Sequence, residues 1–204
     1  MLRRWPLVAM GIVLAIAIAG AEVIDRILAV VDGALITQSD AAAAIRLGLV
    51  AGPADPLAAV VDRLIERRLL LREVDRYAPP DPREADVDRA VIEIRDRTGT
   101  PAQFEAILLQ TGFSLDQLRR HVRDDLRIEA YLQQRFGTVQ PSEEEIQLYY
   151  REHAAQFTQG GVVRPLGEAR DVVKAALVAE RRAETIRGWL ADLRRRANVN
   201  VVLR

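Results

Sequence analysis

The residues best suited to chemistry in this chain are two histidines, His121 and His153, and neither has the neighbours that a reactive site needs. The chain contains no cysteine, which excludes thiol nucleophiles, cysteine-bound metals and disulfides. A zinc site takes three or four ligands, yet no second histidine stands at ligand spacing from either one. We therefore expect no metal and no cofactor, and we expect both histidines to be half-buried or on helix surfaces.

Two runs of like charge have structural explanations that require no ligand. Glu143-Glu144-Glu145 would be a carboxylate cluster, but acids in a first helical turn also stabilise the positive end of the helix macrodipole. Arg194-Arg195-Arg196 would be a nucleic-acid patch, but cations in a last turn complement the negative end. The formal net charge of +0 also argues against a nucleic-acid binder.

Arginine almost replaces lysine, because Lys174 is the only lysine among 29 basic residues. A bias in genomic composition is the simpler explanation. The sharper alternative is a surface that binds phosphate or carboxylate groups, to which the guanidinium group is suited.

The familiar catalytic motifs are missing from the sequence. The glycines form neither a G-x-x-x-x-G-K-[ST] loop nor a G-x-G-x-x-G turn, and there is no G-x-S-x-G elbow. Tyr149-Tyr150 stands at helical spacing from Ile146 and Phe157, and we interpret it as core rather than as a ligand cage. No catalytic residue is predicted, and the substrate-binding residues stay unknown at this stage.

The N-terminus has the layout of a secretory signal peptide. Residues 1–4 are basic, residues 5–18 are apolar, and residues 19–21 are the small triplet Ala-Gly-Ala. We predict that residues 1–21 are a signal peptide, that the mature chain begins at Glu22, and that it is exported to the periplasm. The alternative is an uncleaved anchor in the inner membrane, although the apolar stretch is shorter than the ~20 residues that a spanning helix prefers.

Strands are predicted at both ends of the mature chain. Asp32-Gly33 separates the apolar runs 27–31 and 34–37, which indicates a hairpin because glycine adopts the positive φ of a type I′ turn. A two-stranded hairpin is only marginally stable alone. Residues 199–203 are another β-rich run, so we expect the two ends of the chain to meet in one small sheet.

Seven amphipathic helices are predicted between these strands from their start and stop signals. Thr37 is expected to cap the first, Asp55 to cap the second with Pro56 at N1, and capping boxes begin at Thr100, Ser114 and Ser142. The predicted helices span residues 37–52, 55–79, 87–99, 100–112, 114–137, 142–157 and 168–197. Short connections between helices indicate one mainly α-helical domain over residues 22–204.

In this order the motifs resemble the SurA-type periplasmic chaperones and the related PpiC-type rotamases. Residues 29–37 (AVVDGALIT) are similar to the hairpin that opens that family. Similar helical elements are residues 64–71 (LIERRLLL), 113–119 (FSLDQLR) and 141–146 (PSEEEI) with Tyr149, Tyr150 and Phe157. The long last helix and strand resemble the segment that pairs back onto the N-terminal strand. The resemblance implies a SurA N-terminal-like chaperone domain over nearly all of residues 22–204.

The departure from the family concerns its parvulin isomerase domain, which would lie between Phe157 and Glu168. Only the ten residues 158–167 join the two flanking helices, whereas an independently folding unit needs about 40 residues. No catalytic residue can therefore be carried over, and we expect a loop in this place.

The resemblance implies an ATP-independent periplasmic chaperone whose partners are unfolded polypeptides, with outer-membrane barrel precursors as clients. It also implies an apolar groove, whose residues the sequence does not identify because every apolar stripe is equally explained by the core. Two alternatives remain open. One is a peptidyl-prolyl isomerase with an unrecognised site, and the other is an interaction module whose uncleaved leader provides its only membrane contact.

Overall fold

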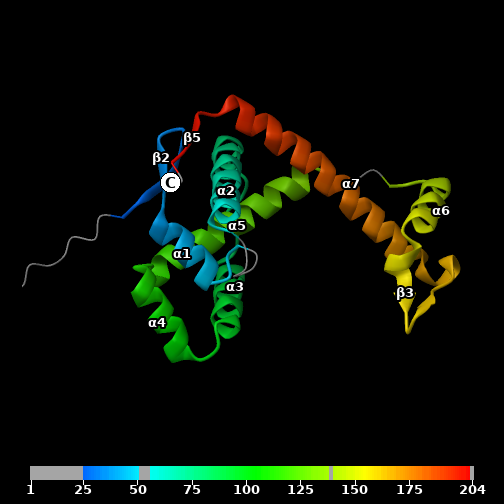
Figure 1. The fold of residues 1–204 in the computed structure, drawn as a ribbon, viewed down its shortest axis with the longest axis horizontal. Helices are drawn as coiled ribbons and strands as arrows, with labels where there is room; N and C mark the ends of the chain where they lie inside the picture. The colour runs from blue at the N-terminus through cyan, green and yellow to red at the C-terminus, as the bar shows by residue number, and fades with distance from the viewer. Residues whose placement is uncertain (1–24, 51–55, 138–139, 203–204) are drawn as a thin grey trace, which may run out of the picture.

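The computed structural model describes residues 25–50, 56–137 and 140–202. These residues form seven α-helices and two small antiparallel sheets, as expected for a mainly α-helical fold (Figure 1). The predicted signal peptide, residues 1–21, lies outside the described residues, and so its cleavage stays a prediction. No helix in the described ranges combines the length and the apolar character needed to span a bilayer.

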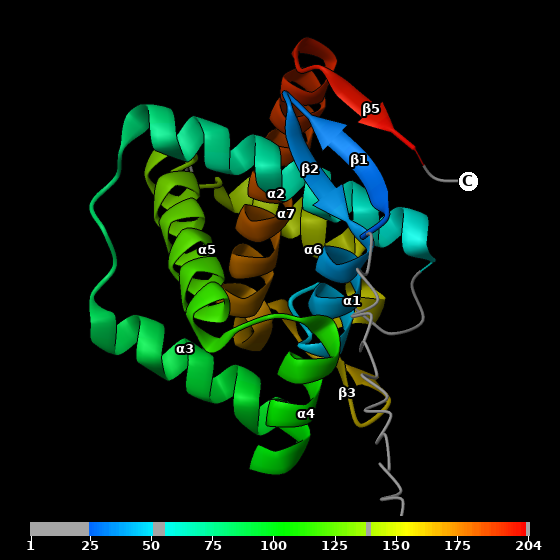
Figure 2. The same ribbon diagram turned by 90° about the vertical axis from the view of Figure 1, so that its left-hand side faces the viewer.

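The two ends of the chain meet in one sheet, as predicted. Strands β1 (Ile27–Val31) and β2 (Ala34–Thr37) form an antiparallel hairpin. Its turn has positive φ at both Asp32 (48°) and Gly33 (86°), which a type I′ turn requires. Strand β5 (Val199–Val201) pairs antiparallel with the other side of β1, and the resulting order is β2-β1-β5 (Figure 2).

The first helix, α1 (Gln38–Arg46), begins as predicted and ends earlier than predicted. Thr37 forms a capping box at its start. The predicted end near Gly52 is wrong because Gly48, at φ 64°, closes a Schellman motif in which the Leu49 amide donates to the Ala44 carbonyl at 2.8 Å. Apolar residues just beyond the helix had extended the predicted stripe.

The second helix, α2 (Leu57–Tyr77), begins one residue later than predicted. Pro56 has ψ 145° and is the N-cap, so its predicted place at N1 is wrong. Asp55, the predicted cap, lies outside the described residues. The helix ends before the prolines as expected, with Ala78 left-handed at φ 44°, because a residue that precedes proline is disfavoured in the right-handed helical region.

Three of the remaining five helices begin at their predicted capping boxes, and the other two begin three and two residues before the predicted positions 87 and 168. These five helices are α3 (Glu84–Arg97), α4 (Pro101–Thr111), α5 (Leu115–Arg135), α6 (Glu143–Glu152) and α7 (Leu166–Arg196). Capping boxes are present at Thr100, Ser114 and Ser142. The sixth helix is shorter than predicted, because the chain continues after His153 as the 3-10 turn η1 (Ala154–Phe157).

Most of the apolar core lies in a body made of the three-stranded sheet and α1 to α5. One cluster packs the sheet against α1 and α2, and its largest fully buried members are Leu28, Val60, Val61 and Ile65. A second cluster joins α1, α3, α4 and α5 around Leu47, Val87 and Leu118. The sheet therefore covers one face of α2, against which α1, α5 and α7 also pack. Helix α3 packs against α5, and α4 packs against α1.

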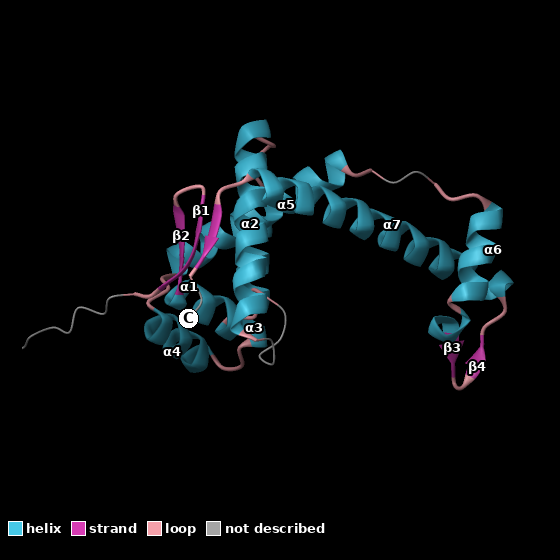
Figure 3. Ribbon diagram, turned by 45° about the horizontal axis from the view of Figure 1, so that its top comes forward, coloured by secondary structure: helices cyan, strands magenta, loops and turns pink. Residues whose placement is uncertain are grey.

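A separate part, here called the outer lobe, lies at the far end of α7 from the body (Figure 3). It consists of α6, η1, a short hairpin of β3 (Thr158–Gln159) and β4 (Val162–Val163), and the first turns of α7. Its own core contains Ile146, Tyr149, Phe157, Ala169, Val173 and Leu177. The expectation of a loop over residues 158–167 is wrong for the first part of this segment, which is a hairpin. Gly160 and Gly161, with positive φ of 60° and 82°, form its turn.

Polar contacts fasten α6 to α7 within the outer lobe. The Tyr149 hydroxyl donates to Glu180 Oε2 at 2.6 Å, and Arg181 pairs with Glu145 at 2.7 Å. Arg170 also pairs with Glu143. The hydrogen bond to Glu180, together with burial, raises the pKa of Tyr149 to about 12, so this phenol stays protonated and remains a donor throughout the neutral range.

A three-residue ionic contact connects α2 to α5 in the body. Arg67 Nε donates to Asp125 Oδ1 at 2.7 Å, and Arg67 Nη2 donates to the His121 carbonyl at 3.0 Å. His121 Nε2 lies 3.2 Å from Asp125 Oδ2. Burial acts to raise the pKa of the Asp125 carboxyl, but hydrogen bonds and charge from His121 and Arg67 outweigh it and hold the pKa below its ordinary value.

The outer lobe offers a test of its separate core. Val173 is fully buried there, whereas its neighbour Val172 is 53% exposed. Val173→Ala should destabilise the lobe by about 2 kcal/mol, through lost burial and a cavity. Amide exchange measured by mass spectrometry should then accelerate by about thirtyfold in α6 and the first half of α7. The matched variant Val172→Ala should change neither region, and equal acceleration in α2 would contradict an independent lobe core.

The contact between α2 and α5 should depend on pH in a defined direction. Because the folded pKa of Asp125 is lowered, its ionised form stabilises the fold above the unfolded pKa of about 4, and this stabilisation is lost as the pH falls further. Asp125→Asn should cost about 1 kcal/mol at neutral pH, a modest value because the side chain is 46% exposed.

Urea unfolding of wild type and Asp125→Asn at several pH values measures this difference. It should shrink below about pH 4. Asp171→Asn, at an almost fully exposed carboxylate, is the control and should leave stability unchanged at every pH. A difference that stays constant down to about pH 2 would refute the ionic origin of the effect.

Candidate functional site

The structure does not bring the two histidines together. His121 lies in α5 in the body, and His153 follows α6 in the outer lobe, where it stacks on Tyr149 at 4.1 Å between ring centroids. Within the described part of the chain, no three histidines or carboxylates are grouped so that they could hold a metal ion. Each histidine bonds locally, His121 to Asp125 and His153 through Nδ1 to the Tyr149 carbonyl at 3.0 Å.

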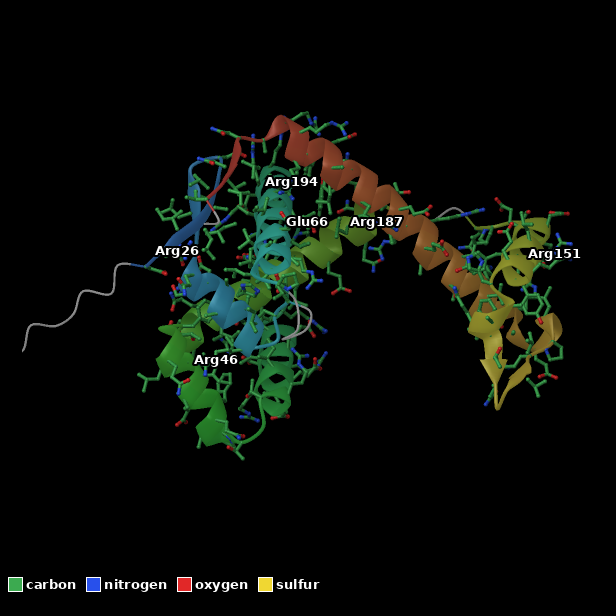
Figure 4. All side chains as sticks on the ribbon, in the orientation of Figure 1. Arg26, Arg46, Glu66, Arg151, Arg187 and Arg194 are labelled. Carbon is green, nitrogen blue, oxygen red and sulfur yellow. The ribbon has the colours of Figure 1, made fainter. Side chains whose placement is uncertain are left out.

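The charge runs lie in the helix turns to which the sequence assigned them. Glu143, Glu144 and Glu145 occupy the first turn of α6, and Arg194, Arg195 and Arg196 occupy the last turn of α7. In addition they fasten helices together, which the sequence did not reveal. Arg194 pairs with Asp62 of α2 at 2.7 Å (Figure 4).

The tyrosine pair belongs to the core of the outer lobe, as interpreted from its spacing. Tyr149 is buried, and Tyr150 packs against the same cluster while its hydroxyl donates to the Arg164 carbonyl at 2.6 Å. Both hydroxyls are thus occupied by internal partners.

An aromatic cluster that the sequence did not identify forms where α2, α5 and α7 meet. The ring centroids are 5.5 Å apart for Tyr77 and Tyr131, 6.1 Å for Tyr131 and Trp189, and 5.1 Å for Phe136 and Trp189. The guanidinium of Arg135 lies over both Phe136 (5.5 Å) and Trp189 (5.2 Å). These tilted contacts and the cation–π pair hold the body end of α7 against α5.

Three adjoining hollows, two of them lined by residues of this cluster, form what we call the junction groove. The Tyr77 hollow, about 370 Å³, lies between the ends of α2 and α5. The Phe136 hollow, also about 370 Å³, lies between the end of α5 and the middle of α7. The Leu132 hollow, about 540 Å³, lies between α2, α5 and α7. Arg135 borders the first two and Arg182 borders the last two, which makes the hollows neighbours.

The junction groove has apolar walls and polar groups that the fold leaves unused. Leu70, Ile128 and Leu132 line its largest hollow. The Tyr131 hydroxyl and Arg182 Nε are buried without a hydrogen-bond partner among the described residues. Burial raises the pKa of the Tyr131 phenol, although the neighbouring Arg135 cation opposes this, so the hydroxyl is a donor at neutral pH.

The sequence held one signal for this site. The chain has only four phenylalanines, four tyrosines and two tryptophans, and four of these ten residues gather at the junction. The signal was weak because they come from positions 77 to 189 on three helices. The groove can bind a molecule by noncovalent interactions, namely ring stacking, apolar contact and hydrogen-bond donation from arginine and tyrosine.

Comparison with known proteins identifies what this arrangement resembles. No protein-family model matches the chain. The foldase protein PrsA from two strains of Clostridium botulinum is 26% identical over 104 residues, which cover 49% of this chain and 31% of PrsA. The matched region thus spans about a third of the length of these curated relatives.

A solved structure extends the likeness to most of the chain. It comes from the pair PEB4 and Cj1289 of Campylobacter jejuni, which are described as structurally related SurA-like chaperones, and it superposes with a TM-score of 0.53 at 14% identity. The match covers 88% of this chain and 100% of the other. The chain described here therefore has the fold of the SurA-like chaperones.

Proposed function

We propose that this protein is an ATP-independent chaperone that holds unfolded envelope polypeptides in the junction groove. The observation that carries the proposal is a set of three adjoining hollows, two of them lined by Tyr77, Tyr131 and Phe136, in a fold shared with SurA-like chaperones. Hollows with apolar and aromatic walls and a few placed polar groups are typical of binding sites. Tyr77, for example, is 56% exposed although it stacks on buried Tyr131.

The clients that fit this surface are precursors of outer-membrane barrels. Their strands alternate apolar and polar residues and have unpaired edges, so they aggregate when left free in water. A groove that binds the unfolded form reversibly lowers its free concentration by mass action and requires no nucleotide. The proposed compartment is the periplasm, on the strength of the predicted leader, and Cj1289 is itself described as a periplasmic protein.

The outer lobe fits this function as a second wall. Helix α7 holds the lobe at a distance from the body (Figure 1), so the lobe can contact a part of the client that extends beyond the junction groove. Exposed apolar side chains at its hairpin, Val162 and Val163, extend the contact surface.

Removal of apolar surface from the groove should impair holding without unfolding the protein. In the variant Tyr77→Ser with Val178→Ser, two groove-lining side chains become polar. The amount needed to halve the light scattering of a diluted, urea-unfolded barrel protein should rise about fivefold, as expected for the loss of about 1 kcal/mol of contact. Wild type should suppress the scattering at equimolar amounts.

The matched control is Leu109→Ser with Ile92→Ser, which removes two exposed apolar side chains of the body outside the groove. Leu109 is 85% exposed on α4. This control should act like wild type. If it lost as much activity as the groove variant, holding would be nonspecific adhesion, and if wild type failed to suppress scattering, the proposed function would be wrong.

Export should leave a defined end on the mature protein. We expect protein released from the periplasm by osmotic shock to begin at Glu22, because cleavage after residues 19–21 follows the small-residue rule of signal peptidase sites. Edman sequencing or intact mass measures this directly. A chain that retains Trp5 and stays with the inner membrane would instead support the tethered module.

A further inference from the structure

The charges of the junction groove are separated along its length. Five arginines and three carboxylates line the three hollows, and all three carboxylates (Glu66, Asp125 and Glu129) belong to the Leu132 hollow. The Phe136 hollow is lined by three arginines and no acid, and the Tyr77 hollow by one arginine and no acid. The groove is therefore positive at its aromatic end and mixed at the other.

Two of these arginines lack the partner that an arginine in a protein groove usually has. Arg67 pairs with Asp125, and Arg181 pairs with Glu145. Arg135 and Arg182 have no carboxylate partner among the described residues, and they stand on the two sides of the Phe136 hollow. Arg135 is held in place by its two aromatic neighbours, so its donors are oriented in advance.

Buried donors without partners also indicate a ligand that carries acceptor oxygens. Tyr131 is only 4% exposed, lines the Tyr77 hollow, and has an unpartnered hydroxyl. Arg182 Nε is buried and unpartnered beside the Phe136 hollow. Most buried polar groups in proteins are hydrogen-bonded, because an unmet donor costs free energy. A ligand that supplies acceptor oxygens at both places would remove that cost.

We propose that the junction groove selects polypeptide segments in which an aromatic side chain lies next to a carboxylate. The aromatic ring occupies the Tyr77 hollow, which at about 370 Å³ exceeds the ~150 Å³ that suffices for benzene. The carboxylate lies in the Phe136 hollow and accepts hydrogen bonds from Arg135 and Arg182, while a main-chain carbonyl of the client meets the Tyr131 hydroxyl. The inference deepens the proposed function and rests on it.

Isothermal titration calorimetry with four short peptides of one length, in a Gly-Ser background with blocked ends, tests the selectivity. The variable pair is Phe with Glu, Phe with Gln, Phe with Lys, or Ala with Glu. The Phe–Glu peptide should bind about tenfold more tightly than Phe–Gln, as expected for a charge-assisted hydrogen bond. The Phe–Lys and Ala–Glu peptides should bind more weakly still. Added salt should weaken Phe–Glu binding and leave Phe–Gln almost unchanged.

Variants assign the effect to its residues. Arg182→Gln should bring the affinity for Phe–Glu down to that for Phe–Gln. The matched control is Arg187→Gln: Arg187 lies on the same helix (Figure 4), has no ion pair in the described part of the chain, and lines none of the three hollows. It should keep the full ratio. Tyr131→Phe should weaken both Phe peptides several-fold without lowering the melting temperature, because its hydroxyl donates to none of the described residues.

A fifth peptide separates the two sources of a carboxylate. It has no Glu and ends in Phe with a free C-terminus, and it is compared with its amide. Tight binding of the free acid alone would assign the Phe136 hollow to chain ends and overturn the proposal for internal segments.

Equal affinity for Phe–Glu and Phe–Gln would overturn the proposed selectivity, yet the chaperone function would stand if scattering is still suppressed. Absence of binding by every peptide, with scattering still suppressed, would overturn the assignment of client binding to this groove.

Discussion

The pairing of β5 with β1 is the constraint on which the rest of this structure depends. The 31-residue helix α7 runs from the outer lobe back to the body, and this pairing fixes the end of the chain to the sheet. Asp32 is central to it, since its amide donates to the Asn198 carbonyl at 2.9 Å and its carboxylate accepts from the Asn198 amide at 2.9 Å. The same carboxylate pairs with Arg72 of α2. One turn residue thus joins the hairpin, the last strand and the central helix.

Helix α7 is attached to a different part of the protein at each of its ends. It must be fixed to the body by Trp189 and Arg194, and it must carry the outer lobe on its other end through Val173 and Leu177. Between these anchors the surface of the helix is mostly exposed, so this section lines the junction groove and does not belong to an apolar core. The junction groove lies where the fixed part begins, which gives it one rigid side built from aromatic rings.

The sequence predicted local features well and long-range ones poorly, for physical reasons. Thr37, Thr100, Ser114 and Ser142 were recognised because a capping box is complete within four residues. The end of α1 was missed because Leu49 continued the apolar stripe beyond Gly48. The groove could not be located from the sequence, since a tyrosine at position 77 and a tryptophan at position 189 look like ordinary core residues until three helices have packed.

The β3–β4 hairpin has one more consequence. Thr158 and Val163 are directly paired, so the chain leaves the outer lobe and re-enters it at points only about 5 Å apart. Foreign domains are accommodated best at exposed tips where entry and exit coincide. A folded cassette with adjacent termini would replace Gly160-Gly161 without disturbing α6 or α7, so the same frame can exist with or without an enzyme attached.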